Sequence, residues 1–205
     1  MARGQETRTR ILDVAEEAVL AKGFEATSID EIVSAVDITK SGFFYHYPDK
    51  TALACALLER YIETEKAMFD DLFARARDLS DDPLHSLLIG LKLFAEMMND
   101  LPKSHPGCLI ASACYQDRLF DARVRDLNKY ALLAWRKRFH GLFEEIAALY
   151  PPHEPVDLNN LGDMVSGVVE GGIILSRALE ERHAIADQIL LFRTYVKLLF
   201  LPRSV

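Results

Sequence analysis

The chain lacks long apolar segments. None of its 205 residues belong to an apolar run near the roughly 18 residues that a membrane-spanning helix needs. The first ten residues, MARGQETRTR, are charged and contain no apolar stretch of the kind found in secretory signals. There are only three cysteines, an odd number, which is typical of a reducing compartment rather than of a disulfide framework. We therefore expect a cytoplasmic protein without a membrane partner.

Motifs of the common catalytic and metal sites are missing as well. The sequence has no glycine-rich loop for phosphate, no nucleophile elbow and no pair of carboxylates on one helix face. The histidines are scattered, without the paired spacing of metal ligands. Cys108 and Cys114 fall on different faces of a helix, which suits neither a zinc site nor an internal disulfide. A redox-sensing thiol is an alternative to a buried structural one, but we expect no metal, no cofactor and no enzyme activity.

Positive charge is scarce. The chain has 24 Lys and Arg against 31 Asp and Glu, a net charge of −7. Residues 1–50 follow the same trend, with more acidic than basic side chains. Such a balance argues weakly against nucleic-acid binding, so DNA contact would need a local basic patch with the acids turned away. The candidates for that patch are Arg3, Arg8, Arg10, Lys40, His46 and Lys50.

Apolar residues recur at helical spacing through almost the whole chain, and no strand pattern, repeat or low-complexity tract interrupts them. We therefore expect an all-α fold with about nine helices. The expected helices are 7–22, 28–36, 40–47, 50–77, 83–100, 107–115, 117–149, 157–179 and 185–201.

Residues 28–50, SIDEIVSAVDITKSGFFYHYPDK, contain the most informative pattern. Ser28 followed by Glu31 is typical of a capping box at a helix start. A second short helix begins after a cap at Thr39 and ends before Pro48. Two short helices joined by a tight turn present side chains to the DNA major groove in many proteins, although the same arrangement is common in helical proteins that bind no DNA.

The string TKSGFFYHYPDKTAL, residues 39–53, resembles the recognition-helix signature of the tetracycline-repressor family. The string RILDVAEEAVLAKGFEATSIDEI, residues 10–32, is similar to that family's first helix, glycine stop and second helix. The resemblance implies a helix-turn-helix DNA-binding domain over residues 1–50 and a ligand-binding and dimerisation domain over 51–205. It also implies a homodimeric transcriptional regulator, specifically a repressor that binds a palindromic operator in double-stranded DNA and is released by a small-molecule effector.

The resemblance assigns DNA binding to the second short helix and its flanks. The DNA-binding candidates are Thr39, Lys40, Ser41, Gly42, Phe44, Tyr45, His46 and Lys50. Two residues depart from the family pattern. Gly42 stands where a side chain such as Thr is common, which removes one potential base contact. Asp30 stands where many members have an Arg that helps to read DNA; because Asp30 would repel phosphate, we interpret it as a partner of its own helix dipole.

An effector site would need aromatic and methionine side chains, which suit a small, mostly apolar molecule. The same residues would equally form the plain core of a helical bundle. The ligand-binding candidates are Met68, Phe69, Phe94, Met98, Cys108, Tyr115, Tyr130, Trp135 and Phe139.

The segment 164–175 is apolar nearly all round, so it must be covered on more than one side. Glycines four residues apart would let another backbone approach closely, which favours a two-fold interface of four helices over a core helix within one chain. The dimer-interface candidates are Gly167, Glu170, Gly171, Ile174, Arg177, Phe192 and Val196. The alternative to a regulator is a helical enzyme, or an adaptor protein that binds a different partner through these helices.

Overall fold

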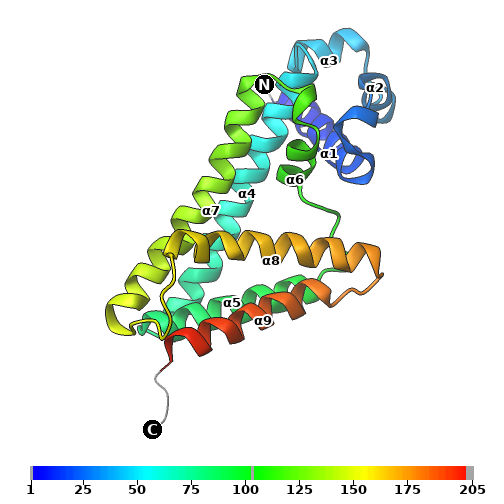
Figure 1. The fold of residues 1–205 in the computed structure, drawn as a ribbon. Coiled ribbons are helices and arrows are strands. Elements are labelled where there is room, and N and C mark those ends of the chain that lie inside the picture. The colour runs from blue at the N-terminus through cyan, green and yellow to red at the C-terminus, as the bar shows by residue number, and fades with distance from the viewer. Residues whose placement is uncertain (1, 103, 202–205) are drawn as a thin grey trace. The chain divides into compact units, whose positions relative to one another are not determined.

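The computed structural model describes residues 2–102 and 104–201, without the side chains of residues 2 and 3. Within these residues the fold is entirely helical, as predicted, with nine α-helices and one 3₁₀ turn (Figure 1). The elements are α1 (Ala2–Ala26), α2 (Ile29–Val36), α3 (Lys40–His46), α4 (Lys50–Leu79), α5 (Pro83–Asn99), α6 (Leu109–Tyr115), η1 (Asp117–Leu119), α7 (Ala122–Leu149), α8 (Leu158–Ala178) and α9 (Ala184–Phe200). Among the described residues, no helix combines the length and apolarity that crossing a membrane requires.

The chain divides into two compact units. Unit one contains Met1–Glu65 and Pro106–Ala131, and unit two contains Lys66–His105 and Leu132–Val205. The expected division at residue 50 is a functional one, and these packing units do not follow it. Unit one includes the first part of α4, all of α6 and the first part of α7 in addition to α1–α3.

Unit one is built around a continuous apolar core. Buried residues from α1, α2 and α3 meet those of α4 and α6 in that core, which explains why helices as short as α2 and α3 are stable here. α6 packs against α1, and Phe120 places its ring edge-on to Phe24 with the centroids 4.9 Å apart. α1 is interrupted at Gly23, whose φ of 84° favours glycine. The side-chain Oε1 of Gln116 accepts a hydrogen bond from the amide of Glu25 just beyond that kink.

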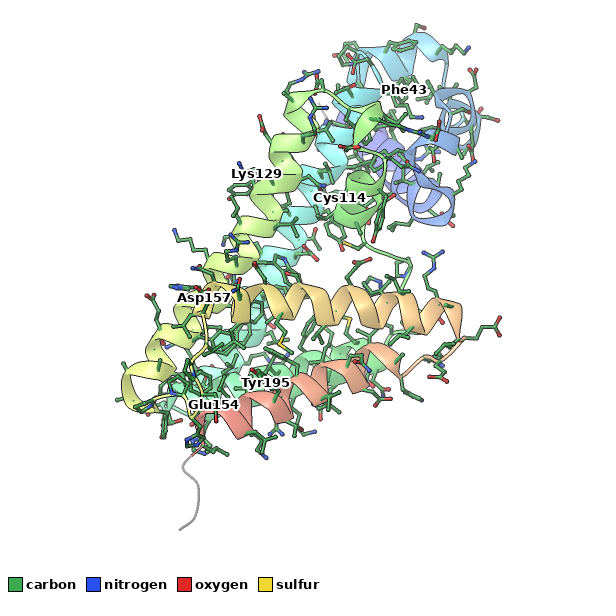
Figure 2. The ribbon with its side chains drawn as sticks, in the orientation of Figure 1. Phe43, Cys114, Lys129, Glu154, Asp157 and Tyr195 are labelled. Carbon is green, nitrogen blue, oxygen red and sulfur yellow. The ribbon has the colours of Figure 1, made fainter. Side chains whose placement is uncertain are left out.

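Unit two consists mainly of α5, α8 and α9, with the remaining parts of α4 and α7. α9 packs against both α8 and α5, and Figure 1 shows the three helices side by side. α8 begins where predicted, because Asp157 (labelled in Figure 2) caps it by accepting a hydrogen bond from the amide of Asn160 at 2.9 Å. The guanidinium of Arg136 on α7 donates two hydrogen bonds to Asp163 on α8, at 2.8 and 2.6 Å.

Candidate nucleic-acid interface

Side-chain caps define both helices of the α2–α3 pair. The hydroxyl of Ser28 accepts a hydrogen bond from the amide of Glu31 at 3.1 Å, and that of Thr39 accepts one from the amide of Gly42 at 3.1 Å. The two predicted caps are thus confirmed. The reciprocal half of the predicted capping box is replaced, because the Glu31 carboxylate accepts two hydrogen bonds from Lys22 of α1, at 2.7 and 2.6 Å. These bonds lower the pKa of Glu31 and tie α2 to α1.

Aromatic residues of α3 separate into an inner and an outer set. Phe43, labelled in Figure 2, is completely buried, and Tyr47 is buried directly after the helix. Phe44 is half exposed, and Tyr45 is 84% exposed. The inner pair anchors α3 in the core of unit one, so the outer pair points to solvent together with Lys40.

The candidates that the sequence singled out at α3 share this outward surface. Thr39 and Ser41 are exposed with their hydroxyl oxygens 3.0 Å apart, and His46 is half-buried. A Cβ built on Gly42 would meet Thr39 Oγ1 at 3.3 Å and the Cβ of Ile38 at 3.8 Å. A side chain at position 42 would therefore press against the Thr39 hydroxyl that caps α3.

Lys40 forms an ion pair with Asp30 of α2, with 2.7 Å between Nζ and Oδ1. This corrects two expectations. Asp30 does lie in the first turn of α2, but its carboxylate binds a basic side chain of α3 instead of serving its own helix alone. The acidic residues of the N-terminal helix-turn-helix region, residues 1–50 (the head), are also not all turned away from the candidate surface. The sequence offered no signal for this pair, because the two residues belong to different helices whose packing sets the distance.

The other basic side chains expected in the DNA patch contact the head itself. The guanidinium of Arg8 lies over the Tyr47 ring, 5.3 Å from its centroid, and Arg10 donates to the carbonyl of Val36 at 2.9 Å. Lys50 reaches the carbonyl of Glu25 at 3.4 Å, and burial lowers the pKa of this lysine while Glu25 partly offsets the effect. The side chain of Arg3 lies outside the described residues.

The ligand-binding candidates fall into different surroundings. In unit two, Phe69 contacts Phe94, Trp135 and Phe139 through edge-to-face rings, with centroids 5.1, 4.8 and 5.9 Å apart. Three of these rings are fully buried in the core and Trp135 is half-buried. Met68 and Met98 are half-buried in the same unit.

The remaining ligand candidates, Cys108, Tyr115 and Tyr130, belong to unit one. Tyr115 and Tyr130 are largely exposed, so neither is enclosed as a residue lining an effector cavity would be. Cys108 is half-buried, and its Sγ accepts a hydrogen bond from the amide of Ala111 at 3.4 Å, which caps α6. That contact is a structural role that the sequence pattern did not reveal.

The dimer candidates also separate by exposure. Nothing lies within 4 Å of a Cβ built on Gly167 or Gly171, and Ile174 is exposed on the same helix. Glu170 is half-buried and Arg177 is exposed. Phe192 and Val196, in contrast, are buried within the chain, so their side chains form core contacts and are not part of an open surface. The exposed apolar residues of α9 that the sequence analysis missed include Leu191 and Leu198, whose seven-residue spacing was the available signal.

Comparisons with known proteins agree with this architecture. Residues 11–57 match the family model described as bacterial regulatory proteins, tetR family. The chain is 30% identical over 125 residues to the probable HTH-type transcriptional regulator ArpR of Pseudomonas putida, which covers 61% of this chain and 49% of ArpR. It thus spans about half the length of that relative. It is 25% identical over 194 residues to the uncharacterized HTH-type transcriptional regulator YxaF of Bacillus subtilis, which covers 90% of this chain and 93% of YxaF.

The fold is similar to that of a solved TetR-family transcriptional regulator from Agrobacterium tumefaciens. The TM-score is 0.78 at 18% identity, with 96% of this chain and 99% of that chain covered. The signature at α3 and the match over residues 11–57 identify a DNA-binding region of the tetR-family type, and the fold of the whole chain is that of solved TetR-family transcriptional regulators.

Proposed function

We propose that this protein represses transcription by binding a palindromic DNA operator as a homodimer, and that a small-molecule effector releases it. The observation that carries the proposal is the division of α3 into a buried side and an outward side. Phe43 and Tyr47 fix the helix in the core, whereas Lys40, Phe44 and Tyr45 are exposed on the side that would enter a major groove. Repression, as opposed to activation, rests on the family resemblance.

In this proposal residues 1–50 read DNA and residues 51–205 bind the effector and the second subunit. Lys40, Ser41 and Gly42 begin the recognition helix, next to the base edges. Phe44, Tyr45 and His46 face the groove wall and the phosphates, together with Thr39 and Lys50. An exposed tyrosine is well suited to this role, because its hydroxyl can donate to phosphate while its ring covers the sugar.

The proposed dimer forms through the outer faces of α8 and α9. Gly167 and Gly171 leave space for a second helix, and Ile174, Leu191 and Leu198 expose apolar surface on the two helices. Contiguous exposed apolar surface is a common feature of interaction sites. Dimeric helix-turn-helix proteins read two half-sites about 34–36 Å apart, one turn of the duplex, which is the reason for expecting a palindromic operator.

The proposed effector site lies in unit two, beside the four aromatic rings of Phe69, Phe94, Trp135 and Phe139. Aromatic and methionine side chains can adapt to a small apolar molecule, and Trp135, Met68 and Met98 are only half-buried. An effector that binds the conformation with the wrong spacing of the two α3 helices would lower DNA affinity by its preference for that conformation.

The test is selection of bound duplexes from random DNA with the purified full chain. The wild type should enrich a palindromic motif, and Lys40→Ala and Tyr45→Ala should each lose the base preference at one or more positions of that motif. Tyr115→Ala is the matched control, because Tyr115 is a similarly exposed tyrosine, at 78%, outside the helix-turn-helix, and it should leave the motif unchanged. If a folded dimer enriches no motif, DNA reading is refuted, and a search for a protein partner or a substrate becomes the next step.

A further inference from the structure

An exposed ion pair lies on the outward surface of the helix-turn-helix. Lys40 is the first residue of α3 and Asp30 lies in the first turn of α2, and α2 packs against α3. The Nζ of Lys40 is 2.7 Å from Oδ1 of Asp30, and the two side chains are 63% and 69% exposed. The ammonium and the carboxylate are therefore close enough to contact neighbouring atoms of one base pair.

Stability does not account for this pair. Exposed ion pairs contribute little to folding because water and salt screen them. The Lys40–Asp30 pair is more exposed than the Lys22–Glu31 pair, whose side chains are 40% and 41% exposed, so screening weakens it more. An acid on a DNA-facing surface also repels phosphate, so Asp30 weakens binding unless it makes a favourable contact with the bases.

The hydrogen-bonding capacity of the pair is only partly used. An ammonium has three donors, and the ion pair with Asp30 can occupy at most one of them, which leaves two or more. A carboxylate can accept about four hydrogen bonds, and Lys40 can supply at most one of them. The pair thus presents free donors directly beside free acceptors.

A G·C base pair presents the complementary pattern in the major groove. Guanine offers two adjacent acceptors, N7 and O6, and cytosine N4 offers a donor next to O6. In an A·T pair the atom beside adenine N7 is a donor, and the thymine side offers an acceptor and a methyl group. On an A·T pair an ammonium over the purine would keep the N7 acceptor but meet the N6 donor in place of O6, and a carboxylate over the pyrimidine would meet the O4 acceptor or the methyl group.

We propose that Asp30 and Lys40 act as one specificity-determining unit that selects a G·C base pair at one position of each operator half-site. Lys40 donates to guanine O6 and N7, and Asp30 accepts from the N4 amino group of the paired cytosine. This inference rests on the proposed DNA-binding function and adds to it the base pair that is read and the residues that read it.

The experiment begins with selection from random DNA, using the wild type, Asp30→Ala, Lys40→Ala and the double variant. Affinities are then measured for the selected operator and for operators in which each G·C pair is replaced by A·T symmetrically in both half-sites. The wild type should prefer G·C at one position by about 5- to 150-fold, as expected for one well-made base contact. Each single variant should reduce that preference to about twofold or less at that position only, and the double variant should lose no more than either single one.

Chemical variants of the base pair identify the atoms. Replacing the guanine by 7-deazaguanine removes N7 and should weaken wild-type binding but have little effect on Lys40→Ala. Replacing it by inosine removes only the minor-groove amino group and should leave wild-type binding unchanged. The matched protein control removes the second exposed ion pair of the head, with Lys22→Ala and Glu31→Ala, and should leave every base preference as in the wild type.

Two results would overturn the inference while leaving DNA binding intact. If Asp30→Ala binds all sequences more tightly with unchanged preferences, Asp30 only neutralises Lys40. If the two single variants lose preference at different positions, the residues do not read one base pair. Absence of any enriched motif from the folded wild type would overturn the proposed function and this inference with it, so the two failures are distinguishable. Thermal unfolding of each variant should match the wild type, because both side chains are exposed.

Discussion

Replacing Gly172 by alanine should destabilise unit two, whereas the same change at Gly171 should not. A Cβ built on Gly172 would lie 2.8 Å from the Cα of Ile185, where ordinary contact begins at 3.4 Å. The obstructing atom belongs to the backbone of α9, so it cannot rotate away as the end of a side chain would. α8 and α9 would have to separate, and the fully buried Ile185 would lose packing on both sides.

The magnitude follows from two opposing effects. Overpacking a dense core costs about 1–3 kcal/mol. Alanine is about 1 kcal/mol more favourable than glycine inside a helix, and this gain applies equally at positions 171 and 172. Gly172→Ala should therefore lower the free energy of unfolding by up to about 2 kcal/mol, and Gly171→Ala should raise that of the isolated subunit by up to about 1 kcal/mol. The difference between the two variants isolates the steric cost.

Urea unfolding at two protein concentrations is the appropriate assay, because the stability of a dimer depends on concentration. Gly141→Ala on α7 is the control for helix propensity, since nothing lies within 4 Å of a Cβ at that position. If Gly171→Ala weakens the protein increasingly as it is diluted, the added methyl group obstructs the proposed dimer. If Gly172→Ala is as stable as Gly141→Ala, close approach of α8 and α9 is not the reason for this glycine, and the argument is refuted.

Gly23→Ala should lower the free energy of unfolding by about 1–3 kcal/mol, because φ is 84° and the new Cβ would lie 2.6 Å from Nε2 of Gln116. Thermal unfolding would measure the loss, and an unchanged midpoint would contradict the prediction. Tyr150→Phe removes the hydroxyl that donates to Asp82 Oδ2 at 2.6 Å. Burial alone would raise the pKa of Asp82, but the hydrogen bonds that it accepts hold its pKa below the ordinary value. The stability from this depressed pKa is present above about pH 4 and lost as the pH falls through the folded pKa, so the variant should be less stable than the wild type near neutral pH and the difference should narrow in acid. Urea unfolding at pH 7 and pH 3 would test this, and equal differences at the two pH values would refute it. Thr39→Ala removes the cap of α3 and should cost about 1 kcal/mol, seen as faster amide exchange at the start of α3, and Thr39→Ser should restore protection.

Local sequence signals predicted the helices well where a cap or a proline marks the start. Pro83 after Asp82 and the cap at Asp157 gave the beginnings of α5 and α8 correctly. The first helix begins earlier than predicted, at Ala2, and the predicted stop at Gly23 is confirmed as a non-helical kink, after which the chain resumes helical geometry to Ala26. The single helix expected over 117–149 is divided, since Phe120 adopts an extended backbone and inserts its ring against α1. That contact is tertiary and has no local signature.

The same limit applies to the candidate site. The family resemblance placed Tyr45 among the DNA-binding candidates, and its side chain is exposed as that role requires. Apolar spacing could not separate the core from an exposed surface on α9, where Phe192 and Val196 are buried but Leu191 is exposed. Both faces of such a helix are apolar, and only the packing of α5 and α8 decides which one is covered.

The internal use of cations in the head has a kinetic consequence for the proposed regulator. Arg8, Arg10, Lys22 and Lys40 each contact a partner within the protein, and the surrounding charge is negative. Attraction to arbitrary duplex comes mostly from free cations that displace counterions, so non-specific complexes should be weak and short-lived, with a shallow dependence of affinity on salt. Such a protein would find its operator by repeated encounters from solution and would slide little along DNA, and its occupancy would change little with the ionic strength of the cell.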